Sequence, residues 1–584
     1  MAGAPDSSGS PARWRRAAVA LGAAFVLGAA GLYTAGMLHA GPVLWPDACG
    51  YLSGAKVVAE RQEYGLSLVQ LNPFVLPDPP DLDRVPWWPP GYSVAIALAS
   101  GLNPGDPSAM VAAAHVLDLV CELAAAAGFG LLAALAVRSS TAGFVAAGLY
   151  LLSAPCMFEA PRLESEHLYL ALMAWAAVLH MRGASRPRGR EIAGAAVLWA
   201  LAALTRHVAV VAAGCAGLAA VAIAWPHADR WRRAAYGLLP TLACWAGAGA
   251  WVVRNLAIAG RPTAPLWPGL RGYAAQATEV ALSYFWGISG TALMPSAAPQ
   301  MRDLVMLAGG FLLGASLLTL AVAAVMGRRQ HSPEAWRWLL VFAGCLVPVS
   351  ILMLVYVSVN QRINTPFGRL ISPATAVTVA LLIAGAVRYG LLRAPVILLA
   401  ICITAGGLLQ GATNLLLPNG WEALADLRAL AADEQVREAV RGKRLLLAAE
   451  DGVRPAVDLV PVSVFVPTAR TVYWVDNPQY AGVVLSGEDI ADLVRQGAFE
   501  LLLRGPRRRV VEGAAAAGVG TVRRARERVR EQYAQGQLNE IRYLQQFTVR
   551  PPLKTGTIAT HGDWTVERVL LRRGPPRSNK RRRD

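Results

Sequence analysis

One carboxylate, Asp47, lies directly after the first long apolar run of the sequence, in the segment 45–52. A carboxylate held at the edge of a bilayer is suited to act as a general base that takes the proton of an attacking hydroxyl group. Aspartate is also a preferred N-cap residue, so Asp47 is equally suited to cap a helix that begins near Ala48. The two roles are compatible, and Tyr51 follows one helical turn later as a candidate substrate contact.

A second group of ionisable residues separates two apolar runs in the stretch Pro161-Arg162-Leu163-Glu164-Ser165-Glu166-His167. Charges between two membrane spans are costly unless they line a water-filled cavity, so they are candidates for a functional site. Glu164 and Glu166 lie two residues apart, so only one of them faces the cavity if the segment is helical. We expect these glutamates to be catalytic acids and His167 to contact substrate, and a solvated loop is the alternative.

Several arginines lie at the same expected membrane face, each at the end of an apolar run. A guanidinium presents a planar fork that matches phosphate oxygens. Snorkelling toward lipid headgroups is the alternative for each one singly, but it would favour the cytoplasmic face. The residues expected to bind substrate in this way are Arg206, Arg254 with its neighbour Asn255, and Arg369.

The sequence contains no glycine-rich nucleotide loop of the Walker or dinucleotide type, no His-Glu-x-x-His pattern and no CxxC pair. ATP, NAD and a protein-caged zinc ion are therefore not expected, and no cofactor is predicted, although a divalent metal stays open. An enzyme that works at an outer membrane face without a nucleotide needs a donor that arrives already activated.

The elements that position these residues are apolar helices. The chain has 584 residues, 55% of them hydrophobic, and apolar runs of roughly 17 to 25 residues recur, the length that crosses ~30 Å of hydrocarbon. A cleaved signal peptide is the alternative for the first run, which is longer than a typical apolar region of ~7–15 residues. The sequence predicts a polytopic α-helical membrane protein with about eleven spans, at 17–38, 110–135, 142–157, 168–181, 192–204, 208–225, 234–253, 304–326, 338–359, 370–387 and 394–417.

The arginine-rich short loops all fall on one side by span parity, which predicts that this side is cytoplasmic. We therefore expect a cytoplasmic segment 1–16, a transmembrane module 17–417 with an outer loop 40–109, and an extracytoplasmic C-terminal region. The formal charge of +17 is spread over many loops, so a membrane explanation is favoured over nucleic acid.

The composition changes after residue 417. Strands are expected near 445–448, 499–503 and 564–571, with a capped helix at 490–496, so residues 418–573 are predicted to form a small soluble α/β domain before a basic tail, 574–584.

Taken in order, these motifs resemble the GT-C superfamily of polytopic glycosyltransferases, in the branch with protein O-mannosyltransferases and the bacterial lipid A aminoarabinose transferase. The resemblance covers about residues 40–375. Many relatives carry Asp-Glu in the first outer loop, whereas Ala48 follows Asp47 here, which weakens any carry-over of metal binding or of a paired-acid role in this loop. The matching motifs are Pro46-Asp47-Ala48-Cys49-Gly50-Tyr51-Leu52, Pro89-Pro90-Gly91-Tyr92, Ser165-Glu166, Leu204-Thr205-Arg206, Trp251-Val252-Val253-Arg254-Asn255 and Gly368-Arg369-Leu370-Ile371-Ser372-Pro373.

The resemblance implies an inverting transfer of a sugar from a polyprenyl-phosphate donor to a lipid, glycan or protein acceptor at the outer face. Asp47 would be the base, Glu166 a second acid, and Tyr92 a substrate contact, with the three arginines near the lipid phosphate. A lipid-linked oligosaccharide ligase or polymerase is the nearest alternative. A flippase or transporter is another, and it would predict polar residues inside spans. A nucleic-acid-binding tail at 523–530 is the least favoured alternative.

Overall fold

In this computed structural model, the described residues are 11–44, 46–65, 68–71, 89–103, 105–186, 188–259, 333–360, 372–416, 419–448, 462–465, 471–475, 501–504, 555–561 and 564–569, with 280, 284, 313, 314 and 317. The chain divides into two compact units. The first contains Met1–Val43, Val85–Gly101 and Met110–Ala423, and the second contains Leu44–Arg84, Leu102–Ala109 and Leu424–Asp584.

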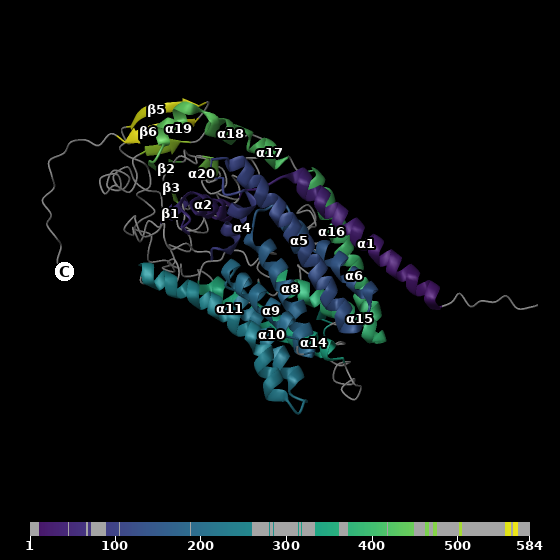
Figure 1. The fold of residues 1–584 in the computed structure, drawn as a ribbon. Helices are drawn as coiled ribbons and strands as arrows, with labels where there is room; N and C mark the ends of the chain where they lie inside the picture. Colours follow the sequence, from purple (N-terminus) through teal and green to yellow (C-terminus); the bar gives the residue numbers. More distant parts are fainter. Residues whose placement is uncertain are drawn as a thin grey trace, which may run out of the picture. The chain divides into compact units, whose positions relative to one another are not determined.

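The first unit is helical (Figure 1). Within it, α8 packs against α9, α9 against α11, and α10 against α11 and α14, while α1 packs against α6 and α16. The helices are α1 (Pro11–Ala40), α4 (Gly91–Ala99), α5 (Pro107–Val137), α6 (Ser140–Leu151), α7 (Ala154–Glu159), α8 (Ser165–Ser185), α9 (Gly189–Thr205), α10 (Ala209–Ala224), α11 (Arg230–Ala259), α14 (Glu334–Asn360), α15 (Ser372–Arg388), the 3₁₀ turn η4 (Gly390–Leu392), α16 (Arg393–Leu416) and α17 (Gly420–Ala423).

The prediction of a polytopic α-helical membrane protein is confirmed. Among the described residues, 5 helices are long and apolar enough to cross a membrane, and further apolar helices are shorter. Every expected span except 142–157 and 304–326 coincides with one described helix, and 304–326 lies almost wholly outside the described residues. The expected span 142–157 is not one helix, because α6 ends at Leu151 and α7 begins at Ala154 with Pro155 in its first turn. Proline lacks the N–H of an internal helical position, so the chain restarts there.

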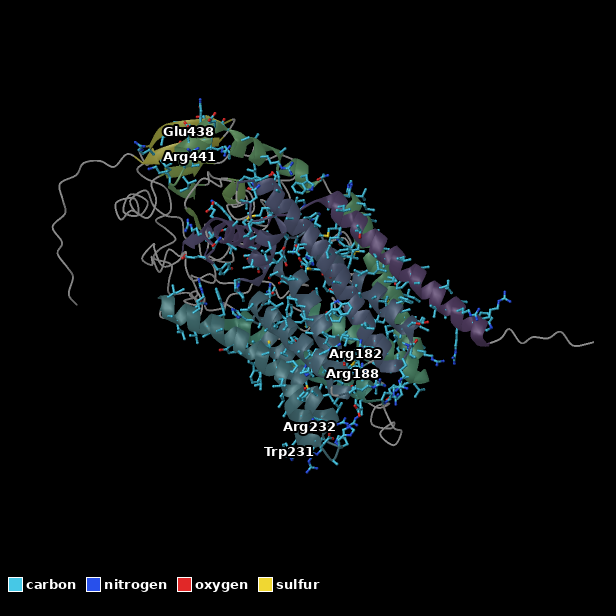
Figure 2. All side chains as sticks on the ribbon, viewed as in Figure 1. Arg182, Arg188, Trp231, Arg232, Glu438 and Arg441 are labelled. Atoms are coloured by element: carbon cyan, nitrogen blue, oxygen red, sulfur yellow. The ribbon has the colours of Figure 1, made fainter. Side chains whose placement is uncertain are left out.

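Small residues allow the helices of the first unit to approach closely. Gly130 in α5 faces Gly143 in α6, and a Cβ atom on Gly130 would lie 2.6 Å from the carbonyl oxygen of Gly143. Close backbone approach of this kind replaces the hydrophobic driving force that helices lack in lipid. The arginines Arg182, Arg188 and Arg232 gather at one end of these helices (Figure 2).

The second unit contains a six-stranded mixed sheet in the order β1-β3-β2-β4-β6-β5. Strands β1, β3, β2 and β4 run parallel to one another, and β6 is antiparallel to both β4 and β5. Helix α2 packs against β1 and α20, and α19 packs against β5 and β6. The elements are α2 (Pro46–Arg61), β1 (Leu68–Leu71), α18 (Ala425–Ala432), α19 (Glu434–Val440), β2 (Arg444–Ala448), α20 (Val462–Phe465), β3 (Thr471–Val475), β4 (Leu501–Arg504), β5 (Thr555–His561) and β6 (Trp564–Val569).

The predicted C-terminal α/β fold is confirmed in β2, β4 and β6, which coincide with the expected strands 445–448, 499–503 and 564–571. The expected helix 490–496 lies outside the described residues. One strand was not expected: β1 comes from the first loop and pairs in parallel with β3, with Leu68 opposite Val472.

Candidate functional site

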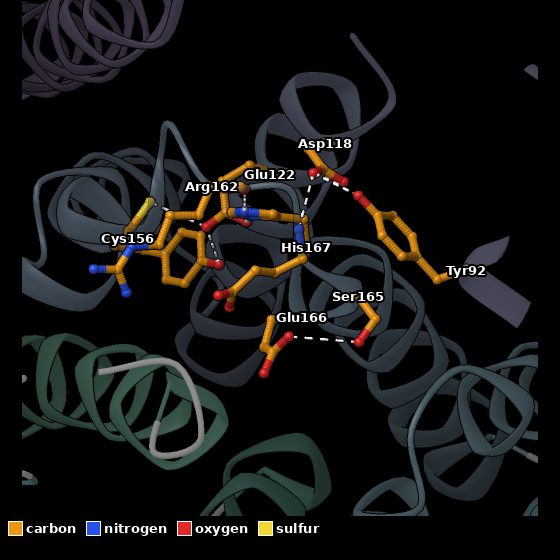
Figure 3. A network of polar contacts seen from close by, with 10 residues as sticks. Tyr92, Asp118, Glu122, Cys156, Arg162, Ser165, Glu166 and His167 are labelled. Atoms are coloured by element: carbon orange, nitrogen blue, oxygen red, sulfur yellow. Dashed lines mark hydrogen bonds and ion pairs between the residues drawn. The ribbon is translucent and has the colours of Figure 1, made fainter. Parts of the chain in front are cut away.

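Polar side chains from α4, α5, α6, α7 and α8 meet inside the first unit (Figure 3). The central interaction joins Glu122 of α5 to His167 in the first turn of α8, with 2.9 Å between Oε2 and Nδ1. The other carboxylate oxygen of Glu122 accepts hydrogen bonds from the Tyr150 hydroxyl at 2.5 Å and from the Cys156 thiol at 3.0 Å. The carboxylate is therefore satisfied on both oxygens, as a buried charge requires.

His167 is held at both ring nitrogens. Its Nε2 atom lies 3.2 Å from the carbonyl oxygen of Arg162, which can only accept a hydrogen bond, so Nε2 carries a proton. The proton between Nδ1 and Glu122 belongs either to the ring or to the carboxyl group. Both placements leave the pair neutral overall, which lowers its cost in an apolar surrounding. His167 was expected to contact substrate, and its side chain is buried in this pair.

A second buried carboxylate, Asp118, lies one turn before Glu122 on α5. Its Oδ2 atom accepts hydrogen bonds from the Tyr92 hydroxyl at 2.7 Å and from the backbone N–H of Glu164 at 3.3 Å. Asp118 thereby joins α4 to the residue that precedes α8. Tyr92, expected to contact substrate, is fully buried in this contact.

The third arrangement lies at the start of α8. Glu166 and Arg206 form an ion pair with 2.6 Å between Oε1 and Nη1, and the same nitrogen donates to the Ser165 hydroxyl at 2.9 Å. Glu166 lies in the first helical turn, where the helix dipole favours a negative charge. Arg206 follows the last residue of α9 in an extended conformation, and 18% of its side chain is exposed.

Helix α4 reaches the end of α9 as well as Asp118. A Cβ atom on Gly91 would lie 2.7 Å from both the Leu204 carbonyl oxygen and the Thr205 hydroxyl, so only glycine fits there. The motif that contains Gly91 and the motif Leu204-Thr205-Arg206 are thus in direct contact.

The segment between α7 and α8 is also held by contacts with α7 and with the residues that follow α1. Arg162 forms an ion pair with Glu159 at 2.9 Å, and its guanidinium lies 4.3 Å from the centre of the Phe158 ring. The backbone N–H of Val43, which follows α1, donates to the carbonyl of Pro161 at 2.7 Å. This segment is therefore tied to α1, α5 and α7 before α8 begins.

A small pocket lies beside these contacts, between α5, α6, α7, α8 and α15. Seven of the eleven lining residues carry a carboxyl or hydroxyl group. Among the described residues, no group of three or more His, Cys, Asp or Glu side chains is arranged to hold a metal ion. The lining residues are Glu122, Tyr150, Ser153, Pro155, Cys156, Glu159, Glu166, His167, Leu170, Ser372 and Thr375.

The remaining candidates lie elsewhere. Asp47 is the second residue of α2 in the second unit, half-buried, and the helix begins at Pro46, close to the expected start. Tyr51 is buried in the same helix, and burial together with the charge of Asp47 raises the pKa of Cys49 well above its usual range.

Arg254 and Asn255 lie near the end of α11 and contact each other. The guanidinium of Arg254 donates to the Asn255 side-chain oxygen at 3.0 Å and lies 4.7 Å from the centre of the Trp251 ring. Asn255 is fully buried. Arg369 lies outside the described residues. The structure thus joins Glu166 to Arg206, and Tyr92 to Glu164 through Asp118.

Asp118 and Glu122 were missed at the sequence level, although the signal was present. They are two acids four residues apart within an otherwise apolar stretch of α5, so they lie on one face of the helix. Ionisable residues within a span are functional candidates by default, and this rule would have identified them.

No protein-family model matches the chain, and a search of curated proteins finds no match. Among solved structures, the chain is similar to ArnT from Cupriavidus metallidurans bound to undecaprenyl phosphate, at 14% identity and a TM-score of 0.49, covering 96% of this chain and 98% of that one.

It is also similar to the archaeal oligosaccharyltransferase AglB from Archaeoglobus fulgidus, at 10% identity and a TM-score of 0.44, covering 84% of this chain and 69% of that chain. The chain is also similar to the arabinofuranosyltransferase AftD from Mycobacteria, at 18% identity and a TM-score of 0.34, covering 85% of this chain and 35% of that chain. These neighbours are GT-C superfamily membrane glycosyltransferases, the superfamily that the sequence motifs resemble.

Proposed function

We propose that this chain is a membrane glycosyltransferase that moves a sugar from a polyprenyl-phosphate donor to an acceptor hydroxyl group. The observation that carries the proposal is the contact of Arg206 with Glu166 and Ser165 at the start of α8. A guanidinium has five N–H donors in a fixed fork, and a carboxylate that holds it in place pre-organises it for a phosphate. The motifs that contain these residues, Ser165-Glu166 and Leu204-Thr205-Arg206, also resemble those of GT-C glycosyltransferases, which supports the proposal.

In this reaction the acceptor oxygen attacks the anomeric carbon while the bond from that carbon to the phosphate oxygen breaks. The phosphate leaves with the electron pair, and Asp47 takes the proton of the acceptor hydroxyl. Arg206, with Arg254 and Arg369, stabilises the negative charge that develops on the phosphate. Glu166 orients Arg206. Glu164, two residues before Glu166 in the sequence, is a further candidate acid. The reaction needs no nucleotide.

The buried contacts behind α8 support this assignment. His167 and the backbone N–H of Glu164 are both anchored to carboxylates of α5, so the first turn of α8 has little freedom to move. A side chain that must meet a phosphate within a few tenths of an ångström needs such support, because a loosely held group loses much of its effect.

The test is transfer from radiolabelled polyprenyl-phosphate sugars by the purified full-length protein, comparing Arg206→Lys with Arg182→Lys. Both arginines form an ion pair with a glutamate, but Arg182 lies at the other end of α8, 2.8 Å from Glu191. Lysine keeps the charge and loses the bidentate fork. We expect Arg206→Lys to weaken use of the donor and Arg182→Lys to leave it unchanged. A defect confined to the acceptor, or none at all, would assign Arg206 to a structural role.

One observation favours a second candidate, a translocase for the lipid carrier. Asp118 and Glu122 lie inside α5, which is a candidate membrane span, and acids within spans mark pathways in transporters. The same labelled donors separate the two functions: a translocase moves the donor across a vesicle membrane without forming a glycosylated product. A product that carries several sugars would instead indicate an oligosaccharide ligase or polymerase.

A further inference from the structure

A cluster of arginines lies at the end of the first unit opposite to the start of α8. It is formed where α8 and α10 end and where α9, α11 and α14 begin. Direct contacts bring these ends together: His180 Nε2 in α8 lies 2.6 Å from the Gly237 carbonyl oxygen in α11, and His227 after α10 lies 3.0 Å from Glu334 in α14. Figure 2 shows Arg182, Arg188 and Arg232 at this end.

We call this region the arginine-rich end. Among the residues that the structure describes, it contains eight arginines and three carboxylates, a formal surplus of five positive charges. Its residues are Arg182, Arg186, Arg188, Arg190, Arg230, Arg232, Arg233 and Arg337, with Glu191, Asp229 and Glu334.

The three carboxylates are shared among a few of the arginines. Glu191 lies 2.8 Å from Arg182 and 3.5 Å from Arg188, while Arg233 lies 3.0 Å from Asp229 and 3.9 Å from Glu334. Within the described part of the chain, Arg230 and Arg232 have no carboxylate within 4.0 Å. These two arginines are exposed and lie at the start of α11.

Two tryptophans accompany these arginines. Trp225 and Trp231 are 56% and 70% exposed, and their rings meet edge to face with 5.8 Å between the centres. The guanidinium of Arg230 lies 5.4 Å from the centre of the Trp225 ring. An indole has a large apolar surface and one N–H donor, so an exposed pair is suited to the headgroup layer, where one part is apolar and the other polar.

We infer that the arginine-rich end binds the phosphate groups of anionic phospholipids through Arg230 and Arg232, with Trp225 and Trp231 seated in the interface. Charge complementarity supports this occupant, because the cluster has more cations than carboxylates and guanidinium groups match phosphate oxygens. Location supports it too, since α11 is a candidate membrane span and both arginines lie at its first turn, where lipid headgroups begin.

The experiment compares retention of dioleoylphosphatidylglycerol and dioleoylphosphatidylcholine by the purified full-length protein, measured by native mass spectrometry. The test variant is Arg230→Gln/Arg232→Gln. The control is Arg437→Gln/Arg441→Gln, which removes the same charge from α19 and the residue that follows it in the second unit. Equal unfolding temperatures establish that both variants are folded.

We expect the wild-type protein and the control to prefer the anionic lipid. The test variant should lose roughly thirtyfold of that preference, the effect of two juxtamembrane charges near an anionic surface. Equal retention of both lipids by the wild-type protein would overturn the inference. So would an equal loss in the control, which would mean that only total charge matters. Neither measurement uses sugar transfer, so the result is independent of the proposed function.

Discussion

Replacing either Glu122 or His167 removes one partner from an ion pair whose side chains are 1% and 3% exposed. The variants Glu122→Leu and His167→Phe each leave the other group buried without its partner. Loss of one member of a buried pair typically costs about 3–5 kcal/mol, because an uncompensated charge or an unsatisfied polar group remains. We therefore expect each single variant to be strongly destabilised.

The double variant Glu122→Leu/His167→Phe should cost about as much as one single variant, well below the sum of the two. It removes both charges together, so no uncompensated ion remains. Some cost stays because the Tyr150 hydroxyl and the Arg162 carbonyl lose their partners, at roughly 1–3 kcal/mol for each buried group. The difference between the sum and the double variant measures the coupling between the two side chains.

Glu122→Gln is the matched conservative variant. The amide oxygen can still accept from Tyr150 and Cys156, and the amide nitrogen can donate to Nδ1 of a neutral His167 that keeps its proton on Nε2. Every hydrogen bond around the pair is then retained, so we expect a loss of only about 1 kcal/mol.

The assay is thermal unfolding of the purified protein in detergent, followed by a thiol-reactive fluorescent dye. Most of the seven cysteines are buried, so the dye reports their exposure on unfolding. Unfolding in detergent is commonly irreversible, so all variants are compared at one heating rate. Additive losses in the double variant, or equal losses in Glu122→Gln and Glu122→Leu, would refute the account of a coupled neutral pair.

Three further predictions concern catalysis, topology and packing. Asp47→Asn should lower sugar transfer by ~10²–10⁴-fold at an unchanged unfolding temperature, and residual activity above about a tenth would leave Asp47 only a structural role in α2. Alkaline phosphatase fused after Gly420 should be active if the C-terminal domain is extracytoplasmic, and an inactive fusion would reverse the predicted orientation. Gly91→Ala should destabilise the protein by about 1–3 kcal/mol because its Cβ would overlap the Leu204 carbonyl oxygen, whereas Gly249→Ala, which meets no atom within 4 Å, should be neutral.

The candidate site shows that local sequence identifies individual functional residues but not the contacts between them. Glu166 and Arg206 were both identified as candidates because charges beside apolar runs are costly in a membrane. Their contact spans 40 positions in the sequence, from residue 166 to residue 206, and depends on the packing of α8 against α9. No local pattern states which arginine meets which glutamate.

The roles of buried residues depended on tertiary packing in the same way. His167 and Tyr92 have the residue types of substrate contacts, yet each is buried against a carboxylate of α5. The two acids of α5 were visible in the sequence as an i, i+4 pair. Their partners lie 26 and 45 positions away, and only the folded chain brings them together.

The sequence by itself determined the class of fold and most helices, because hydrocarbon thickness fixes the length of an apolar span and its backbone must satisfy its own hydrogen bonds. It also indicated the strands β2, β4 and β6, of which β2 and β4 are short apolar runs. Only the tertiary structure decided that β1, from the first loop, pairs with β3. It likewise decided that Glu122 meets His167, because pairings between distant segments depend on how whole elements pack and leave no local pattern in the chain.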